Sequence, residues 1–319
     1  MILAFMIDKY LIKQDGKKYI GIALLGIIIC LYSVKTYSRN FTWKDDYTLF
    51  TTDVKTSTNS AKCNVSAGGL SIEEAKKQKT KEEKMKYIDQ ALTYLHKAAN
   101  LYPKNDVVWL LLGNAHLETE KYNLSVEYYD QSLRLSPGYK DALNNLLYVA
   151  QVTHRNKQYP WSILAYKTLV RHQPNNTEHL IELSNLYDET NRIDTALVIL
   201  NSIVEKKPDY YQAYSKIGEI YGKRLNQIDM AISYLKKAYA INPNDGSVNE
   251  NLGVAYGIKG DFKESIKYML NSIKLDPNNP QTYFNLSASY NRIGEKKLAA
   301  EYMNKAIAVQ KSQQQKAKN

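Results

Sequence analysis

The stretch Trp109-Leu110-Leu111-Leu112-Gly113 opens a pattern that recurs along most of the chain. A large residue is followed three positions later by an aliphatic one, then by a small one, and three positions further on by a bulky one. This spacing marks one face of an α-helix. Sixteen residues after the first large residue, an Ala or Ser opens a second apolar face, which predicts a second helix.

Prolines give the period of this pattern. They recur at intervals of 34, 37, 34, 35 and 34 residues, at Pro103, Pro137, Pro174, Pro208, Pro243 and Pro277. A proline cannot continue the helix behind it, so each one is expected to close a two-helix unit. A fixed period of this length predicts stacked repeats, in which each unit packs only on its neighbours.

These residues resemble the tetratricopeptide repeat, a helix-turn-helix unit of 34 residues. The cleanest copy contains Trp109, Leu112, Gly113, Ser125, Tyr129, Ser132 and Pro137. The resemblance implies an all-α solenoid of about seven repeats over residues 59–313. Small residues let helices approach closely, so Gly113 and Gly253 are expected at tight helix contacts.

The predicted repeats cover residues 59–105, 106–139, 140–176, 177–210, 211–245, 246–279 and 280–313, before a polar tail at 314–319. The first repeat is irregular, because its first helix is expected near residues 60–70 and its second begins well downstream. The charge-dense run at 73–86 between them is predicted to be a solvated helical extension.

An uncharged run of sixteen residues, Tyr19–Val34, lies between Lys18 and Lys35. A bilayer needs roughly 17–25 helical residues, and flanking lysines can supply the missing length. The run predicts one transmembrane helix over 19–37, between a short N-terminal segment at 1–18 and a juxtamembrane linker at 38–58. Two alternatives are less favoured. A cleaved signal peptide is one, but no small-x-small cleavage site follows Val34. A buried helix of a soluble domain is the other, but the repeats begin well downstream.

The basic residues around this run predict its orientation. Four lysines precede it and three basic residues follow it. The excess before the run places the N-terminal side in the cytoplasm. The repeats are then expected outside the cytoplasm, in a periplasm or lumen.

The stretch YSVKTYSRNFTWKDDYTLF, residues 32–50, resembles the membrane-to-repeat junction of the transmembrane, tetratricopeptide-containing O-mannosyltransferases and their bacterial relatives. The matching residues are Arg39, Asn40, Trp43, Asp45, Asp46, Leu49 and Phe50. The resemblance implies that the chain is the repeat-bearing tail of such a protein, without the early membrane loops that hold the catalytic acidic residues. The same residues also fit an ordinary membrane-edge anchor.

The net charge of +11 raises the question of a nucleic-acid partner. Residues 1–44 carry +5 and residues 305–319 carry +4, so the body of the chain carries only +2. No basic stripe is expected on a folded face, and no nucleic-acid partner is predicted.

No catalytic, cofactor-binding or metal-binding residues are predicted, because the five histidines are scattered and no phosphate-loop or nucleophile motif is present. His116 replaces the usual aromatic residue of its repeat and is expected to be a packed core residue. The chain is therefore not expected to be an enzyme, unless it is a fragment of a glycosyltransferase.

The remaining candidate site is the concave side of the solenoid. First-helix residues one and five positions after each opening large residue should line it: Leu110, Asn114, Asn144, Tyr148, Ile181, Asn185, Ser215, Glu219, Glu250, Val254, Phe284 and Ala288. Mixed amide, aromatic and aliphatic residues suit an extended peptide. The residues predicted to bind it are Asn114, Asn144, Tyr148, Asn185, Glu219, Glu250 and Phe284.

These features predict a single-pass membrane-anchored scaffold that binds a protein or peptide. The first alternative is the C-terminal repeat region of a membrane glycosyltransferase that lacks the catalytic part. The second alternative is a structural assembly factor at the cell envelope.

Overall fold

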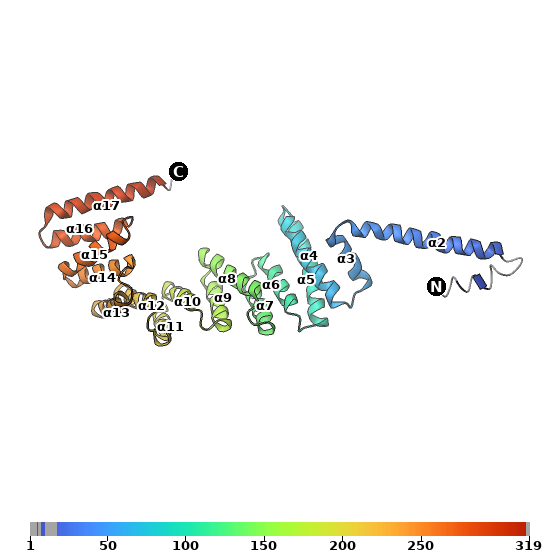
Figure 1. Ribbon diagram of the computed structural model, residues 1–319, viewed down its shortest axis with the longest axis horizontal. Helices are drawn as coiled ribbons and strands as arrows, with labels where there is room; N and C mark the ends of the chain where they lie inside the picture. Colours follow the sequence, from blue (N-terminus) through green and yellow to red (C-terminus); the bar gives the residue numbers. More distant parts are fainter. Residues whose placement is uncertain (1–4, 6–7, 10–17, 317–319) are drawn as a thin grey trace. The chain divides into compact units, whose positions relative to one another are not determined.

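The computed structural model describes residues 5, 8–9 and 18–316, and the secondary structure of these residues is helical apart from turns. The predicted N-terminal segment at 1–18 and the end of the polar tail at 314–319 lie largely outside the described residues. The chain forms two compact units, residues 1–145 and 146–319. The expectation of an all-α tetratricopeptide-type solenoid is confirmed (Figure 1).

The solenoid is built from consecutive pairs of helices, and each pair is one repeat. The pairs are α4 (Ala61–Lys77) with α5 (Lys81–Leu101), α6 (Asp106–Leu117) with α7 (Tyr122–Leu135), α8 (Lys140–Arg155) with α9 (Tyr159–His172), α10 (Thr177–Glu189) with α11 (Ile193–Lys206), α12 (Tyr211–Lys223) with α13 (Ile228–Ile241), α14 (Gly246–Lys259) with α15 (Phe262–Leu275), and α16 (Pro280–Arg292) with α17 (Lys296–Lys316).

Proline followed by Asn or Asp sets the boundary between repeats. Each of the six periodic prolines lies two residues after the last helical residue of its repeat. Two residues later, Asn105, Asn176, Asp245 and Asn279 accept hydrogen bonds from the first backbone N–H groups of the next helix. A short sequence therefore ends one helix and caps the next.

Small residues hold the two helices of a repeat together. A Cβ atom built on Gly113 would lie 2.4 Å from the Tyr129 ring, and one on Gly253 would lie 2.5 Å from Met269 Cγ. Gly68 and Gly218 face Leu95 and Leu235 in the same way. The expectation of tight contacts at Gly113 and Gly253 is confirmed.

Serines at these contacts also supply hydrogen bonds. Ser125 Oγ donates to the Gly113 carbonyl oxygen at 3.0 Å, and Ser162 Oγ donates to the Ala150 carbonyl oxygen at 2.8 Å. A buried hydroxyl satisfied in this way avoids the cost of an unpaired polar group.

The first repeat carries the expected helical extension. The charge-dense run at 73–86 forms the end of α4, a short turn and the start of α5. Lys76 pairs with Glu73 and Lys77 with Glu74 within α4, and most of the run is exposed.

The segment at 38–58 differs from the linker that the sequence predicts. It contains a 3-10 helix, Phe41–Lys44, and the helix α3, Asp46–Thr56, which packs on α4. Asp45 caps α3, because its carboxylate accepts a hydrogen bond from the Thr48 backbone N–H at 2.7 Å. Tyr47 donates from its hydroxyl to Gln90 Oε1 on α5 at 2.8 Å, and Val54 is buried. An N-cap followed by apolar residues at helical spacing explains why the segment is ordered.

The helix α2, Lys18–Asn40, contains a 22-residue segment with a mean hydropathy of 1.9 whose residues are almost all exposed. At 1.5 Å per residue such a segment is about 33 Å long, close to the thickness of a bilayer's hydrocarbon core. By length and composition, this helix can cross a membrane.

We expect Gly253→Leu to destabilise unit 146–319, because the new side chain would collide with Met269 Cγ and with the Ser265 carbonyl oxygen. Overpacking of this kind costs about 1–3 kcal/mol or more. The measurement is the urea-unfolding midpoint of the purified chain, followed by circular dichroism. Met269→Ala in the same chain should offset part of the loss, because it empties the contacted space.

Gly246→Ala is the matched control. A Cβ atom there would lie 3.6 Å from Asp276 Cβ, which is ordinary van der Waals contact, so the midpoint should not fall. An unchanged midpoint for Gly253→Leu would contradict the packing described here.

Candidate binding surface on the first helices

The predicted binding residues on α6 and α8 differ in whether their side chains are already hydrogen-bonded or exposed to solvent. Asn114 Oδ1 accepts hydrogen bonds from the Tyr129 hydroxyl and from Asn145 Nδ2, both at 2.8 Å. These bonds fix the Asn114 side chain between the helices. Asn144 is exposed on α8, and Tyr148, one turn later on the same helix, is 56% exposed. Asn144 and Tyr148 are therefore available to a ligand, whereas Asn114 is used in packing.

In the second unit, the predicted residues occupy successive first helices and are all half-buried. Asn185 lies on α10, Glu219 on α12, Glu250 on α14 and Phe284 on α16. Glu250 Oε2 accepts a hydrogen bond from Asn279 Nδ2 at 2.8 Å, which ties it to the start of the next repeat. That these residues bind a peptide stays a prediction.

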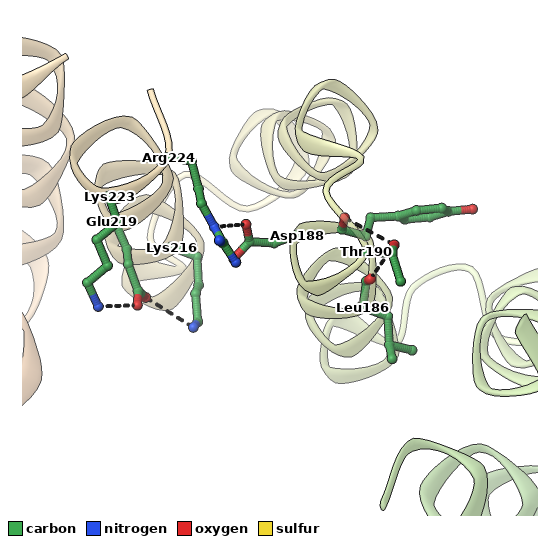
Figure 2. Close-up of polar contacts among 8 residues, drawn as sticks. Leu186, Asp188, Thr190, Lys216, Glu219, Lys223 and Arg224 are labelled. Carbon is green, nitrogen blue, oxygen red and sulfur yellow. Dashed lines mark hydrogen bonds and ion pairs between the residues drawn. The ribbon is translucent and has the colours of Figure 1, made fainter. Parts of the chain in front are cut away.

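Glu219 lies between two lysines of its own helix (Figure 2). Its carboxylate is 2.7 Å from Lys223 Nζ and 3.1 Å from Lys216 Nζ. Burial pushes the pKa of Glu219 upward, but hydrogen bonds and charges from the two lysines outweigh burial and hold the pKa below its usual value. The Glu219 carboxylate is therefore ionised, and the two lysines compensate its negative charge.

Polar side-chain contacts join the ends of neighbouring first helices. Arg224 Nε donates to Asp188 Oδ1 at 2.8 Å, from the end of α12 to α10 (Figure 2). His154 Nε2 lies 3.0 Å from Glu189 Oε2, from the end of α8 to the end of α10. These contacts place the exposed faces of α8, α10 and α12 next to one another in the second unit.

One cavity lies between α14 and α16. It has a volume of about 230 Å³ and is lined by Val254, Gly257, Ile258, Phe262, Met269, Asn285, Ala288, Ser289 and Arg292. Val254 and Ala288 are among the residues that the repeat register places on the concave side. Since most of the lining is apolar, this cavity suits an uncharged side chain.

A larger cavity, of about 730 Å³, lies between α8 and α10. It is lined by Leu147, Gln151, His154, Arg155, Tyr166, Glu178, His179 and Glu182. None of these residues is among the binding residues predicted from the sequence, because the repeat register places only the positions one and five after each opening large residue on the concave side. Glu178 and Glu182 lie two positions before and two after Leu180, so a rule that included those positions would have found them.

A stacked aromatic pair recurs inside four repeats. The ring centroids lie 5.5 Å apart in Tyr221–Tyr234, 5.6 Å in Tyr256–Tyr268 and 5.4 Å in Tyr290–Tyr302, with nearly parallel planes. In the fourth pair His116 stacks on Tyr128 at 5.3 Å. The expectation that His116 is a packed core residue is confirmed, since only 6% of it is exposed.

Burial, followed by the charge of Lys121 and by His96, lowers the pKa of His116 to about 4. Its Nδ1 atom is buried without a hydrogen-bond partner among the described residues. In the described part of the chain, no group of three or more His, Cys, Asp or Glu side chains could hold a metal ion.

The family model that matches the chain is described as "Tetratricopeptide repeat", and it covers residues 107–139, 211–245, 247–279 and 280–313. These four segments are the repeats that contain the stacked aromatic pairs.

Among curated proteins, Protein O-mannosyl-transferase TMTC3 of Homo sapiens is 23% identical over 233 residues, which are 73% of this chain and 22% of the relative. Protein O-mannosyl-transferase Tmtc3 of Drosophila melanogaster is 23% identical over 202 residues, 63% of this chain and 18% of the relative. The chain thus spans about a fifth of the length of these relatives.

Among solved structures, MamA 41-end from Desulfovibrio magneticus RS-1 is 22% identical with a TM-score of 0.48, covering 56% of this chain and 99% of that chain.

We expect the stability of the protein to fall as the pH drops from about 6.5 toward 4, because the unfolded chain binds a proton at His116 that the folded protein excludes. His116→Tyr restores the aromatic residue of the other three pairs and removes the titrating group. The unfolding midpoint of this variant should depend less on pH over that range than the midpoint of the wild type. Parallel pH profiles, with equal midpoints near neutral pH, would contradict the assignment.

Proposed function

The repeats of this chain are tetratricopeptide repeats, and from that premise we propose that the protein is a membrane-anchored scaffold that binds an extended segment of a partner protein. The binding surface is the exposed face of the first helices α8, α10, α12, α14 and α16, which we call the first-helix face. The observation that carries the proposal is the cavity of about 730 Å³ between α8 and α10. Tyr148, on α8, is exposed.

The chemistry of this face supports a peptide ligand. Tyr148 and Phe284 offer aromatic surface, and Asn144 and Asn185 offer amide groups that can bond to a peptide backbone. The cavity between α14 and α16 adds an apolar recess. A surface with a few polar groups and apolar recesses is typical of peptide recognition.

The helix α2 supports the membrane anchor. Ile20, Ile27 and Ile29 are each more than half exposed, so packing against the described residues does not account for their apolar side chains. Tyr37 and Phe41 lie in edge-to-face contact at its C-terminal end, where aromatic residues favour a membrane interface. The repeats then lie on the non-cytoplasmic side, as the basic residues around α2 indicate.

We expect the protein to stay in the membrane pellet after carbonate extraction. Leu24→Arg with Ile27→Arg should release it, because a charged residue at the middle of a membrane helix costs about 2.5–3.5 kcal/mol. Val198→Arg, at an exposed site on α11, is the control and should stay in the pellet. Release of the wild type would reject the anchor, and digestion of the repeats by protease added to the cytoplasmic face would reject the orientation.

We expect a twelve-residue peptide, selected from a random displayed library on the purified chain, to bind the first-helix face. Replacing Asn144, Tyr148 and Asn185 with Ala should weaken its Kd by about ten-fold or more, since each lost buried contact costs roughly 1–3 kcal/mol. Thr195, Val198 and Glu205 on α11 are exposed outside that face, and their replacement with Ala is the control. Unchanged affinity of the variant with Ala at 144, 148 and 185, with its helicity intact, would show that the peptide binds outside the first-helix face.

A second candidate function is the repeat region of a membrane O-mannosyltransferase-like protein. It is favoured by the similarity to TMTC3 over 73% of the chain. The junction also has a defined structure, in which the Arg39 guanidinium lies 3.3 Å from Asp53 on α3 and Asp45 caps that helix. The reading frame upstream of residue 1 tests this candidate. Further hydrophobic helices with acidic residues in their first loops would support it, and a stop codon directly upstream would reject it.

A further inference from the structure

The cavity between α8 and α10 has two chemically different ends. The pair of His154 and Glu189 joins the last turns of the two helices, and Leu147 and Glu182, further back on each helix, line the same cavity. The helices therefore run side by side in the same direction. Glu178 and Glu182 lie toward the start of α10, and Arg155 lies at the opposite end, in the last turn of α8.

The acidic end has a buried floor. Tyr166, on α9, is only 4% exposed, and its ring lies 6.2 Å from the ring of His179. Burial, together with the negative charge of Glu182, raises the pKa of Tyr166 to about 12. The Glu182 carboxylate thus lies near a buried, protonated tyrosine.

The carboxylates of this end are not used in contacts between the described side chains. Neither Glu178 nor Glu182 forms an ion pair or a side-chain hydrogen bond with another described residue. In contrast, Glu219, Glu250 and Glu189 on the same face are each bonded to a neighbouring side chain. Two unpaired carboxylates one helical turn apart, at the edge of an open cavity, complement a cationic side chain.

We propose that the acidic end of this cavity is the subsite for a Lys or Arg side chain of the bound peptide segment. The inference rests on the proposed peptide-binding function and adds a specificity to it. An Arg guanidinium can donate to both carboxylates, and the methylene stem of Lys or Arg can pack on Leu147.

Arg155 gives the subsite a direction. Its positive charge at the far end of the cavity disfavours a second cation there, so the basic side chain of the ligand sits over the start of α10. The neutral Gln151 lies between the two ends on α8 and can bond to the backbone of the ligand. A segment with a basic residue over the start of α10 and uncharged or acidic residues near Arg155 fits this order of charges.

The test uses peptide libraries of nine residues in which the central position is fixed as Arg, Lys, Leu or Glu and the other positions are random. Binding to the full-length chain in detergent is measured by fluorescence polarisation. We expect the Arg and Lys libraries to bind about ten-fold more tightly than the Glu library, with a preference that weakens as salt rises. Glu178→Gln with Glu182→Gln should abolish the preference, and Glu178→Lys with Glu182→Lys should reverse it.

Arg155→Gln is the matched control, because it changes a charge in the same cavity and should keep or strengthen the preference for basic residues. Asp194→Asn and Glu205→Gln, exposed on α11, should have no effect. Equal binding of all four libraries, or a preference that survives the two glutamine substitutions, would overturn the subsite and leave the peptide-binding function standing. Failure of every library to bind would overturn that function itself.

Discussion

In each repeat two helices must pack closely enough to exclude water, and the rest of the solenoid depends on that contact. Gly113 and Gly253 allow the approach, and the large side chains of Tyr129 and Met269 fill the space where a Cβ atom would be. No single repeat can bury its apolar face alone, so the contact is stable only when neighbouring repeats cover the pair. The arrangement also explains why four of the six prolines are followed by a capping Asn or Asp, since each helix must end and the next begin within a few residues.

Serine hydroxyls in this packed interior form hydrogen bonds with backbone carbonyl groups. Ser132 Oγ donates to the Asp106 carbonyl oxygen at 2.9 Å, and Ser272 Oγ donates to the Gly246 carbonyl oxygen at 3.0 Å, the same contact in two different repeats. A serine thus lets the helices approach and pairs its own hydroxyl with a buried backbone group. His116 is one of four described residues with a buried side-chain atom that lacks a partner, and it brings its ring nitrogen into a position that is tyrosine in three other repeats.

Packing of this kind leaves one face of each first helix uncovered, and polar contacts between repeats fix the ends of those helices. Asp188 is bonded to Arg224 and Glu189 to His154, so these side chains are not available to a ligand. Glu178 and Glu182 sit on the same helix, α10, and are not used in this way. The difference between paired and unpaired carboxylates on one helix is what separates structural charge from candidate binding charge.

The sequence by itself determined the repeat and its period. Pro and Gly affect the backbone locally, and the spacing of apolar residues follows from helix geometry. Helices and the turns between them can therefore be predicted from residues close together in the sequence. The sequence also identified His116 as a core position and 19–37 as an apolar helix. It did not determine that residues 46–56 form a helix packed on the first repeat, because that depends on burying Val54 and bonding Tyr47 to Gln90, far along the chain.

Only the tertiary structure decided which first-helix side chains are free. Asn114, Glu219 and Glu250 have the right residue type and register for a ligand, but each is held by a partner in its own or a neighbouring helix. Glu178 and Glu182 were not predicted, because the cavity they line depends on how far apart α8 and α10 lie. The spacing of residues within one helix does not encode that distance. Residue type and period specify a side chain's position on its helix, but whether another side chain reaches it depends on packing between helices about 35 residues apart in sequence.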